Sequence, residues 1–304
     1  MNRFAPLFVI IAASLWGFDG IVLRPSLYSL PVTLVVFLES FIVTLILAPF
    51  FVKQLPDLKI LKHQDWLAFL GVAIFGGAIG TMAITQALFY VNFVNLSIVV
   101  LIQKLQPVFA IALASVMLKE RPAREFYGWS ALAIAGAYFM TFGAALPNFD
   151  TGDKTSQAAF FGLLAVVGFG SSTVFSKRAL RNVGFEMGTF LRFLMTSIVM
   201  LPLVLLMGSA PEIANVTQAK WGVFLLIALF TGGPGIFLYY YGLKRITAST
   251  ATICELAFPL TAVILEYVLR GNILTAIQWV GVIVLFVSIL RVSAIKPSPV
   301  DSSK

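Results

Sequence analysis

The chain has 304 residues, of which 60% are hydrophobic and 11% are charged, and its mean hydropathy is +0.97. A soluble domain carries about 25% charged residues, so this chain has too little charge to cover a water-facing surface. The composition also argues against a disordered chain, a coiled coil or a disulfide scaffold, and the long apolar runs argue against a transmembrane β-barrel. The sequence therefore predicts an all-α integral membrane protein.

The net charge of +8 does not indicate nucleic-acid binding, because the basic residues stand singly and form no patch with interleaved aromatic residues. The chain has one cysteine, Cys254, and one histidine, His63, too few for a disulfide or a metal cluster. It contains no phosphate-binding G-x-x-x-x-G-K-[ST] loop, no H-E-x-x-H helix and no G-x-S-x-G elbow. We expect no catalytic residues, no metal site and no cofactor.

Apolar windows long enough to cross a bilayer follow one another along the chain. A hydrocarbon core of about 30 Å requires about 20 apolar residues in a helix. The connectors between the windows carry Pro, Gly, Asn and charge, which are typical of turns. We predict ten transmembrane helices, at residues 4–23, 32–52, 65–91, 95–118, 126–145, 158–180, 186–208, 221–243, 247–270 and 273–291.

The basic residues predict the orientation, because Lys and Arg are retained on the cytoplasmic side during insertion. With the N-terminus inside, 15 of the 21 Lys and Arg residues lie on the inner face and 4 on the outer face. The other two, Lys104 and Arg192, fall within spans. We therefore expect a multi-pass protein of the cell membrane with both termini in the cytoplasm.

The second half of the chain resembles the first at an offset near 153 residues. Trp16-Gly17 aligns with Phe169-Gly170, Glu39 with Arg192, and Pro49 with Pro202. A repeat of five helices must enter the membrane from the opposite side the second time, which gives inverted repeats suited to alternating access. The predicted units are 1–148, 149–292 and a cytoplasmic tail at 293–304.

Four ionisable residues fall within predicted spans: Glu39, Lys104, Arg192 and Glu255. Such residues are costly in lipid and usually face a cavity, form pairs or serve transport. Two interpretations stay open, structural ion pairs between helices and the lining of a substrate cavity. Asp19 is a weaker candidate, because it lies near the end of the first span and fits the outer interface.

Prolines and glycines mark positions where spans are expected to bend. Gln103 and Pro107 lie one turn apart, as do Glu255 and Pro259, and each proline frees a carbonyl that only a protein-lined or wet site satisfies. The run Gly232, Gly233, Pro234 and Gly235 is interpreted as a hinge or a short unwound segment, with close helix packing as the alternative. The predicted substrate-binding residues are Trp16, Glu39, Gln86, Tyr90, Gln103, Lys104, Arg192, Tyr239 and Glu255.

Several motifs resemble the drug/metabolite transporter superfamily, in particular its ten-helix EamA branch. They are Leu15-Trp16-Gly17, the stretch 105–110 leading to Leu118-Lys119-Glu120-Arg121-Pro122, and Leu256-Ala257-Phe258-Pro259. The chain departs from the family pattern at Gly271-Asn272, where a Glu is usual, and at Glu39, where Arg is common. We interpret 119–122 as a helix stop with topology charges.

The resemblance implies a secondary carrier of the bacterial cytoplasmic membrane in which helices one to four and six to nine surround a central cavity. It suggests export of an amino acid or related zwitterion, with proton or exchange coupling, by a monomer or homodimer. An integral-membrane enzyme and a nontransporting scaffold are the alternatives. The lone His63 argues against the enzyme, and fully paired intramembrane charges would favour the scaffold.

Overall fold

The protein is all-helical in the part of the chain that the computed structural model describes, residues 4–51, 58–59, 61–90, 97–146, 154–271 and 273–295. No strand occurs within these ranges. Nine helical segments of this part are long and apolar enough to cross a membrane. The prediction of an all-α, multi-pass membrane protein is confirmed.

The first half contains five helical stretches, some of which are made of several elements. They are α1 Ala5–Phe18 with the π-helix η1 Asp19–Leu23 and the 3-10 helix η2 Arg24–Leu27; α2 Val32–Phe51; α3 His63–Gly71 with the π-helix η4 Val72–Gly80 and α4 Thr81–Tyr90; α5 Ser97–Gln103 with α6 Gln106–Met117; and α7 Arg124–Phe142. The predicted start of the fourth span at residue 95 lies outside the described residues.

The second half also contains five helical stretches. Its elements are α8 Thr155–Ala179; α9 Phe185–Leu206 with the 3-10 helix η5 Ala210–Asn215; α10 Gln218–Leu226 with the π-helix η6 Ile227–Gly232 and α11 Gly233–Arg245; α12 Ala248–Cys254 with α13 Ala257–Arg270; and α14 Ala276–Ala294. The predicted tail lies outside the described residues from 296 onward.

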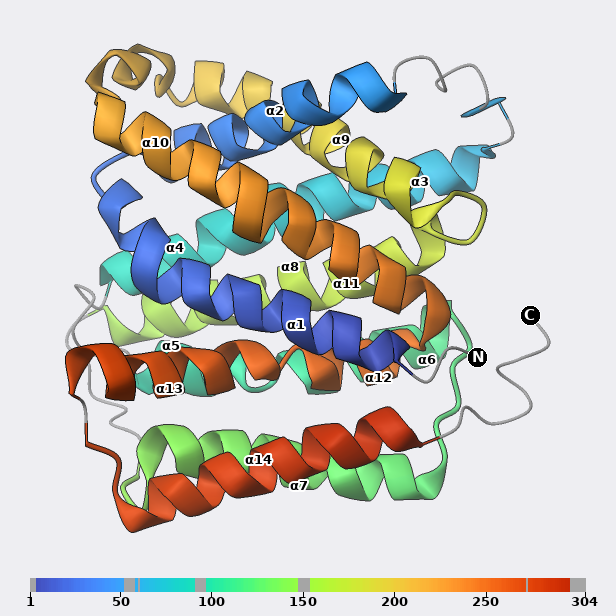
Figure 1. The fold of residues 1–304 in the computed structure, drawn as a ribbon, viewed down its shortest axis with the longest axis vertical. Helices are drawn as coiled ribbons and strands as arrows, with labels where there is room; N and C mark the ends of the chain where they lie inside the picture. Colours follow the sequence, from blue (N-terminus) through green and yellow to red (C-terminus); the bar gives the residue numbers. More distant parts are fainter. Residues whose placement is uncertain are drawn as a thin grey trace.

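The fifth predicted span is absent from the nine segments. It forms α7, a helix of 19 residues that begins with Arg124 and Glu125 and carries Tyr, Gly and Ser among its apolar residues. These residues make α7 less apolar than the other stretches. α7 nevertheless packs along α14, and Figure 1 shows the two helices side by side at the lower edge of the bundle.

Interruptions of the α-helical pattern occur at matching places in the two halves. The third stretch contains the π-helix η4 and the eighth contains the π-helix η6. The fourth stretch breaks at Lys104-Leu105 and the ninth at Glu255-Leu256. At both breaks a three-residue turn replaces the α-helical bond, because Leu105 donates to the Ile102 carbonyl at 2.9 Å and Leu256 to the Ile253 carbonyl at 3.1 Å.

Pro107 and Pro259 follow these two breaks by a few residues, and neither has a backbone N–H. The carbonyl four residues before each proline therefore lacks its α-helical hydrogen-bond donor. These are the carbonyls of Gln103 and Glu255. Polar side chains and backbone carbonyls without an α-helical donor thus occur together in the interior of two spans. The two breaks are the positions around which the candidate site is built.

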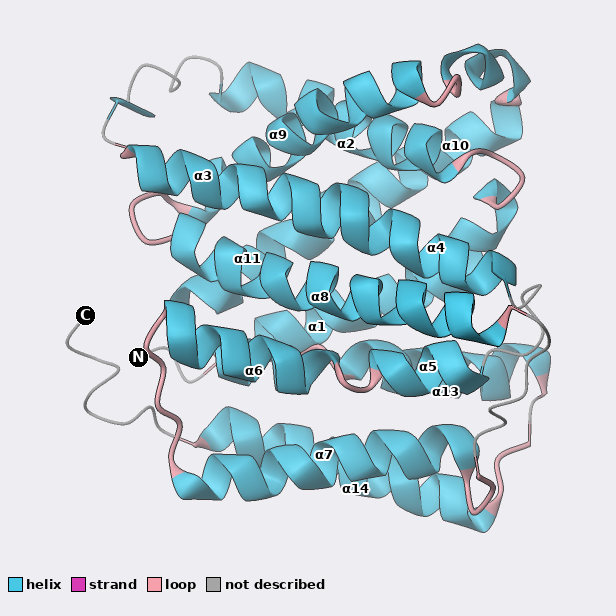
Figure 2. Cartoon of the chain, turned by 180° about the vertical axis from the view of Figure 1, so that it is seen from behind, coloured by secondary structure: helices cyan, strands magenta, loops and turns pink. Residues whose placement is uncertain are grey.

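The helices lie side by side along one direction, with α7 and α14 at one edge and α2, α9 and α10 at the other (Figure 1). α1 begins on the same side of the bundle on which α14 ends. The opposite view in Figure 2 shows α8 between α4 and the α5–α6 stretch. α1 packs against both α11 and α13, so its position among the helices of the second half corresponds to that of α8 among the helices of the first half.

Small residues allow the close approach of these helices, as is usual in membranes. A Cβ on Gly17 of α1 would lie 2.7 Å from the Phe258 carbonyl of α13, and one on Gly170 of α8 would lie 2.6 Å from the Phe109 ring of α6. Gly17 and Gly170 are 153 residues apart, the offset found in the sequence. The two contacts therefore join equivalent helices of the two halves.

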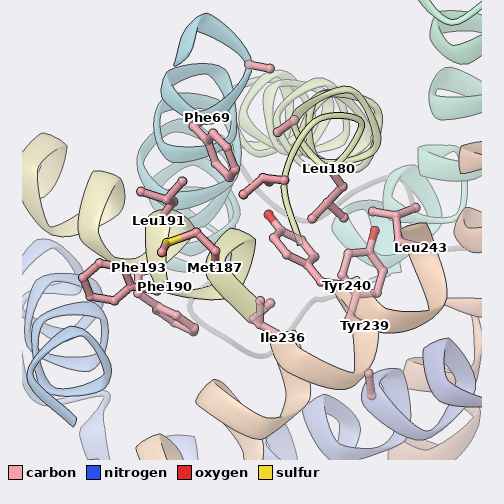
Figure 3. Close-up of a cluster of buried hydrophobic side chains, with 14 of the residues drawn as sticks. Phe69, Leu180, Met187, Phe190, Leu191, Phe193, Ile236, Tyr239, Tyr240 and Leu243 are labelled. Atoms are coloured by element: carbon pink, nitrogen blue, oxygen red, sulfur yellow. The ribbon is translucent and has the colours of Figure 1, made fainter. Parts of the chain in front are cut away.

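A large apolar core lies where α3, α8, α9 and α11 meet. Figure 3 shows Phe69, Leu180, Met187, Phe190, Leu191, Phe193, Ile236, Tyr239, Tyr240 and Leu243 within it. Tyr240 is fully buried and Tyr239 is 3% exposed. These two residues of α11 therefore lie within the protein interior.

Gly281→Ala is expected to destabilise the α7–α14 pair. A Cβ at Gly281 would fall inside the backbone of Met140, which can yield only if the helices separate. Overpacking of this kind costs about 1–3 kcal/mol. Thermal unfolding in detergent measures the change. Gly128→Ala is the matched control, because a Cβ there meets nothing within 4 Å. An equal melting temperature for the two variants would contradict the packing described.

Candidate functional site

The carboxylate of Glu255, at the break between α12 and α13, is held by three neutral side chains from other helices. Tyr239 of α11 donates its hydroxyl to Oε1 at 2.7 Å, and Thr173 of α8 donates to the same oxygen at 3.1 Å. Gln106 of α6 donates its amide to Oε2 at 3.3 Å. The described residues supply Glu255 with no ion pair within 4 Å. We call Glu255, Tyr239, Thr173 and Gln106 the central polar cluster.

The central polar cluster adjoins an aromatic pair. The rings of Trp16 on α1 and Tyr239 lie 5.2 Å apart at 56°. Gly235 allows this approach, since a Cβ there would lie 2.8 Å from the indole Nε1 of Trp16. The predicted residues Trp16, Tyr239 and Glu255 therefore meet at one place in the interior of the bundle.

The run from Gly232 to Gly235 remains helical in the structure. The π-helix η6 ends at Gly232 and α11 begins at Gly233, with Pro234 in its first turn. The wider π turn accommodates a proline that cannot donate a backbone hydrogen bond. The structure therefore does not adopt the unwound segment considered from the sequence, and the hinge role stays a prediction.

Arg192 contacts Tyr240, the residue that follows Tyr239 of the central polar cluster. Its Nη1 lies 3.4 Å from the hydroxyl of Tyr240, and its guanidinium carbon lies 5.7 Å from the centroid of that ring. The hydroxyls of Tyr240 and Ser176 are 3.0 Å apart. Arg192 makes no ion pair with Glu39 or Glu255. Its role as a substrate ligand stays a prediction.

Lys104, at the break between α5 and α6, is only 8% exposed. Its ammonium has no hydrogen-bond or ion-pair partner within the described part of the chain. The neighbouring Gln103 donates its amide to the Gly162 carbonyl at 3.3 Å. The four intramembrane charges singled out in the sequence are therefore not paired with one another among the described residues.

Gln86 and Tyr90 lie on α4, beyond the π-helix η4. The ring of Tyr90 packs at 5.6 Å from that of Phe161, near the start of α8, and the ammonium of Lys154 lies 5.6 Å from its centroid. No contact joins Tyr90 to the central polar cluster in the described residues. Its predicted substrate role has no geometric support, and that of Gln86 stays a prediction.

Glu39 belongs to a second, partly buried group, near the end of α1. Arg24 contacts Asp19 Oδ2 at 2.7 Å through Nη2 and contacts Glu39 Oε1 at 3.2 Å through Nη1. Asp19 is 4% exposed, so it is enclosed by the protein, and its place near the outer interface stays a prediction. We call Asp19, Arg24 and Glu39 the acid pair site.

Glu120 has a structural role that the sequence analysis missed. Its carboxylate accepts hydrogen bonds from the backbone N–H of Ala248 at 2.7 Å, from the backbone N–H of Ser249 at 2.9 Å and from the Ser249 hydroxyl at 2.6 Å. An anion is favoured at a helix N-terminus, because the first N–H groups have no partner within the helix. Glu120 therefore ties the end of the fourth stretch to the start of the ninth, and 119–122 is more than a helix stop.

A pocket of about 410 Å³ lies away from both groups, between α7, α13 and α14. Its lining residues are Met140, Thr141, Val263, Glu266, Ile273, Leu274 and Gln278. None of the predicted substrate-binding residues lines it. The candidate site is therefore defined by the contacts of Glu255 and its neighbours rather than by this pocket.

The fold is that of a multi-pass membrane protein with polar side chains in its interior. The EamA-like transporter family model matches residues 3–142 and again residues 156–294, so the chain belongs to this family. Because its family and its named relatives are transporters, the protein is a transporter and not an enzyme.

Two relatives and one solved structure resemble the chain over much of its length. A protein of Fusobacterium nucleatum subsp. nucleatum named riboflavin transporter ImpX is 42% identical over 288 residues, covering 94% of this chain and 96% of the relative. Uncharacterized transporter YwfM of Bacillus subtilis is 27% identical over 62% of this chain and 61% of its own. A crystal structure with a TM-score of 0.73 covers 99% of both chains at 16% identity, which shows the fold alone.

Glu120→Ala is expected to lower the stability of the protein, because it leaves two backbone N–H groups at the start of α12 without an acceptor. Hydrogen bonds to a charged group contribute about 1.5–3 kcal/mol each, so a loss of at least about 2 kcal/mol is expected. Thermal unfolding in detergent is the measurement. Glu125→Ala, an exposed carboxylate on α7, controls for the change in charge. Equal stability of the two variants would show that the cap contributes nothing.

Proposed function

We propose that the protein transports riboflavin, or a flavin closely related to it, across the cytoplasmic membrane. The support is the 42% identity to the named riboflavin transporter over nearly the whole of both chains. The same proposal explains the chemistry of the central polar cluster, which offers hydrogen bonds and aromatic surface without an ion pair.

The chemistry of riboflavin fits these side chains. Its ring system is planar and uncharged, with an imide edge and several hydroxyls on the side arm. The rings of Trp16 and Tyr239 provide aromatic surface for such a plane. The oxygens of Glu255 and Thr173 and the amide of Gln106 provide hydrogen-bonding groups beside it. A neutral ligand of this kind requires no charge partner.

The family resemblance led us to expect export of an amino acid, which would be a different ligand for the same region. A zwitterion would require an acid and a base that face one another across the site, such as Glu255 with Lys104 or Arg192. The groups that contact Glu255 are instead the neutral side chains of Tyr239, Thr173 and Gln106. We therefore favour the flavin, and competition between amino acids and labelled riboflavin for uptake separates the two ligands.

We infer alternating access between inverted repeats as the mechanism. The support is the double match of the family model, the recurrence of the breaks and π-helices at matching spans, and the packing of α7 along α14 as a tenth crossing. The proposed units are 1–148 and 149–292. We propose that both ends of the chain lie in the cytoplasm; the support is the charge count and the common side of the start of α1 and the end of α14.

Tyr239→Phe and Glu255→Gln are expected to reduce riboflavin transport about tenfold or more. Each removes or weakens a hydrogen bond to a charged group, which contributes about 1.5–3 kcal/mol. Uptake of labelled riboflavin into proteoliposomes is the measurement. Tyr267→Phe is the matched control, because that ring packs against Trp279 at the periphery.

Three results would contradict the proposal. One is wild-type protein that moves no riboflavin in either direction, and a second is wild-type protein that prefers an amino acid. The third is full transport by both variants, which would remove the central polar cluster from the substrate path.

A further inference from the structure

We propose that the acid pair site, Asp19, Arg24 and Glu39, binds and releases a proton and thereby couples flavin transport to proton movement in the same direction. The coupling rests on the proposed function, whereas proton binding at the site is independent of it. The flavin is neutral, so its accumulation requires a second species that carries free energy.

The site brings two carboxylates from different helical elements to a single guanidinium. Arg24 donates to Asp19 Oδ2 through Nε at 2.9 Å and through Nη2 at 2.7 Å. It reaches Glu39 more loosely, with Nη1 at 3.2 Å from Oε1 and Nη2 at 3.3 Å from Oε2. Asp19 lies on η1, Arg24 on η2 and Glu39 on α2.

This arrangement leaves one negative charge in excess inside the protein. Two carboxylates and one guanidinium sum to a net charge of −1, and a buried net charge is costly within a bilayer. Asp19 Oδ1 and Glu39 Oε1 are both enclosed and lack a hydrogen bond of good geometry in the described residues, although Glu39 Oε1 lies 3.2 Å from Arg24 Nη1. A proton on one of these oxygens neutralises the group.

In the part of the chain that the structure describes, no cation other than Arg24 contacts the two acids. α13 packs against η1, and its Arg270 pairs with Glu266 at 2.6 Å and points Nη2 to the Ile21 carbonyl at 3.4 Å. Tyr28, at the end of η2, is exposed. The other ionisable residues on elements that pack against η2 or α2 are Lys220 of α10, Glu186 and Arg192 of α9, Glu212 of η5 and Tyr90 of α4. None of them contacts Asp19 or Glu39 within the described ranges.

Glu39 is the acid that accepts the proton. Asp19 makes the two shorter bonds with Arg24, so those two residues form the tight ion pair. The side chain of Glu39 is 15% exposed, whereas that of Asp19 is 6% exposed, so Glu39 is the less enclosed of the two acids. A proton from water adds to the Glu39 carboxylate and gives a neutral carboxyl, and its release on the other side of the membrane restores the carboxylate.

The separation of the two sites favours movement in the same direction. The acid pair site shares no residue with the central polar cluster, so a proton and a flavin do not compete for one carboxylate. Both ligands can therefore be bound together. The protonated group is neutral, and a neutral group is the form that a membrane interior accepts during a conformational change.

A pH gradient across proteoliposomes tests the coupling. Wild-type protein is expected to accumulate riboflavin in vesicles that are alkaline inside, and a protonophore is expected to abolish the accumulation. Glu39→Gln is expected to keep the exchange of labelled for unlabelled riboflavin at equal pH and to lose the accumulation. Asp19→Asn removes the same excess charge and is expected to behave alike, so that poor folding of one variant leaves the test intact. Glu125→Gln, on the exposed start of α7, is the control.

Infrared difference spectroscopy of the purified protein across a pH titration tests proton binding without any substrate. A protonated-carboxyl band is expected in the wild type and is expected to disappear in Glu39→Gln. Accumulation by both variants at the wild-type level, or an unchanged band, would overturn the inference. Failure of wild-type protein to exchange riboflavin at equal pH would overturn the proposed function instead, and the band would then still decide whether the site binds a proton.

Discussion

The constraint that organises this protein is that lipid satisfies no backbone hydrogen bond and no charge. A span can therefore be interrupted only where the protein itself supplies partners. The chain interrupts two spans, at Lys104-Leu105 and at Glu255-Leu256, and it tightens the backbone locally at both. At the second break three helices contribute side chains to one carboxylate, that of Glu255. The position of the candidate site follows from the position of this break.

The buried polar residues divide into groups with different roles. Glu120 joins the end of one broken stretch to the start of the other, as a structural cap. The central polar cluster joins α6, α8, α11 and the α12–α13 break around neutral donors, which suits an uncharged ligand. The acid pair site carries an excess charge that suits a proton. A carrier needs a rigid frame, a ligand site and a source of free energy, and this division provides a residue group for each.

Much of the fold was predictable, because the hydropathy of each span and the recurrence of residues at an offset of 153 are visible in the sequence itself. The helix bounds lie within about four residues of those predicted, and both breaks follow the polar residue that precedes each proline. Side-chain partners were less predictable. The sequence suggested that Glu39 and Arg192 are equivalent, but Glu39 binds Arg24 of a neighbouring element. Glu120 was missed because its partners, at 248 and 249, lie 128 and 129 residues away along the chain. Such pairings depend on how helices pack, which single-sequence patterns do not encode.

The central claim is that the break at Glu255, with Trp16 and Tyr239, forms the ligand site. An experimental structure of the full chain determined with riboflavin tests it most directly. The account predicts the flavin ring against Trp16 and Tyr239, with a polar atom of the ligand within hydrogen-bond distance of Glu255, Thr173 or Gln106. Riboflavin bound in the pocket between α7, α13 and α14, with the central polar cluster undisturbed, would contradict it.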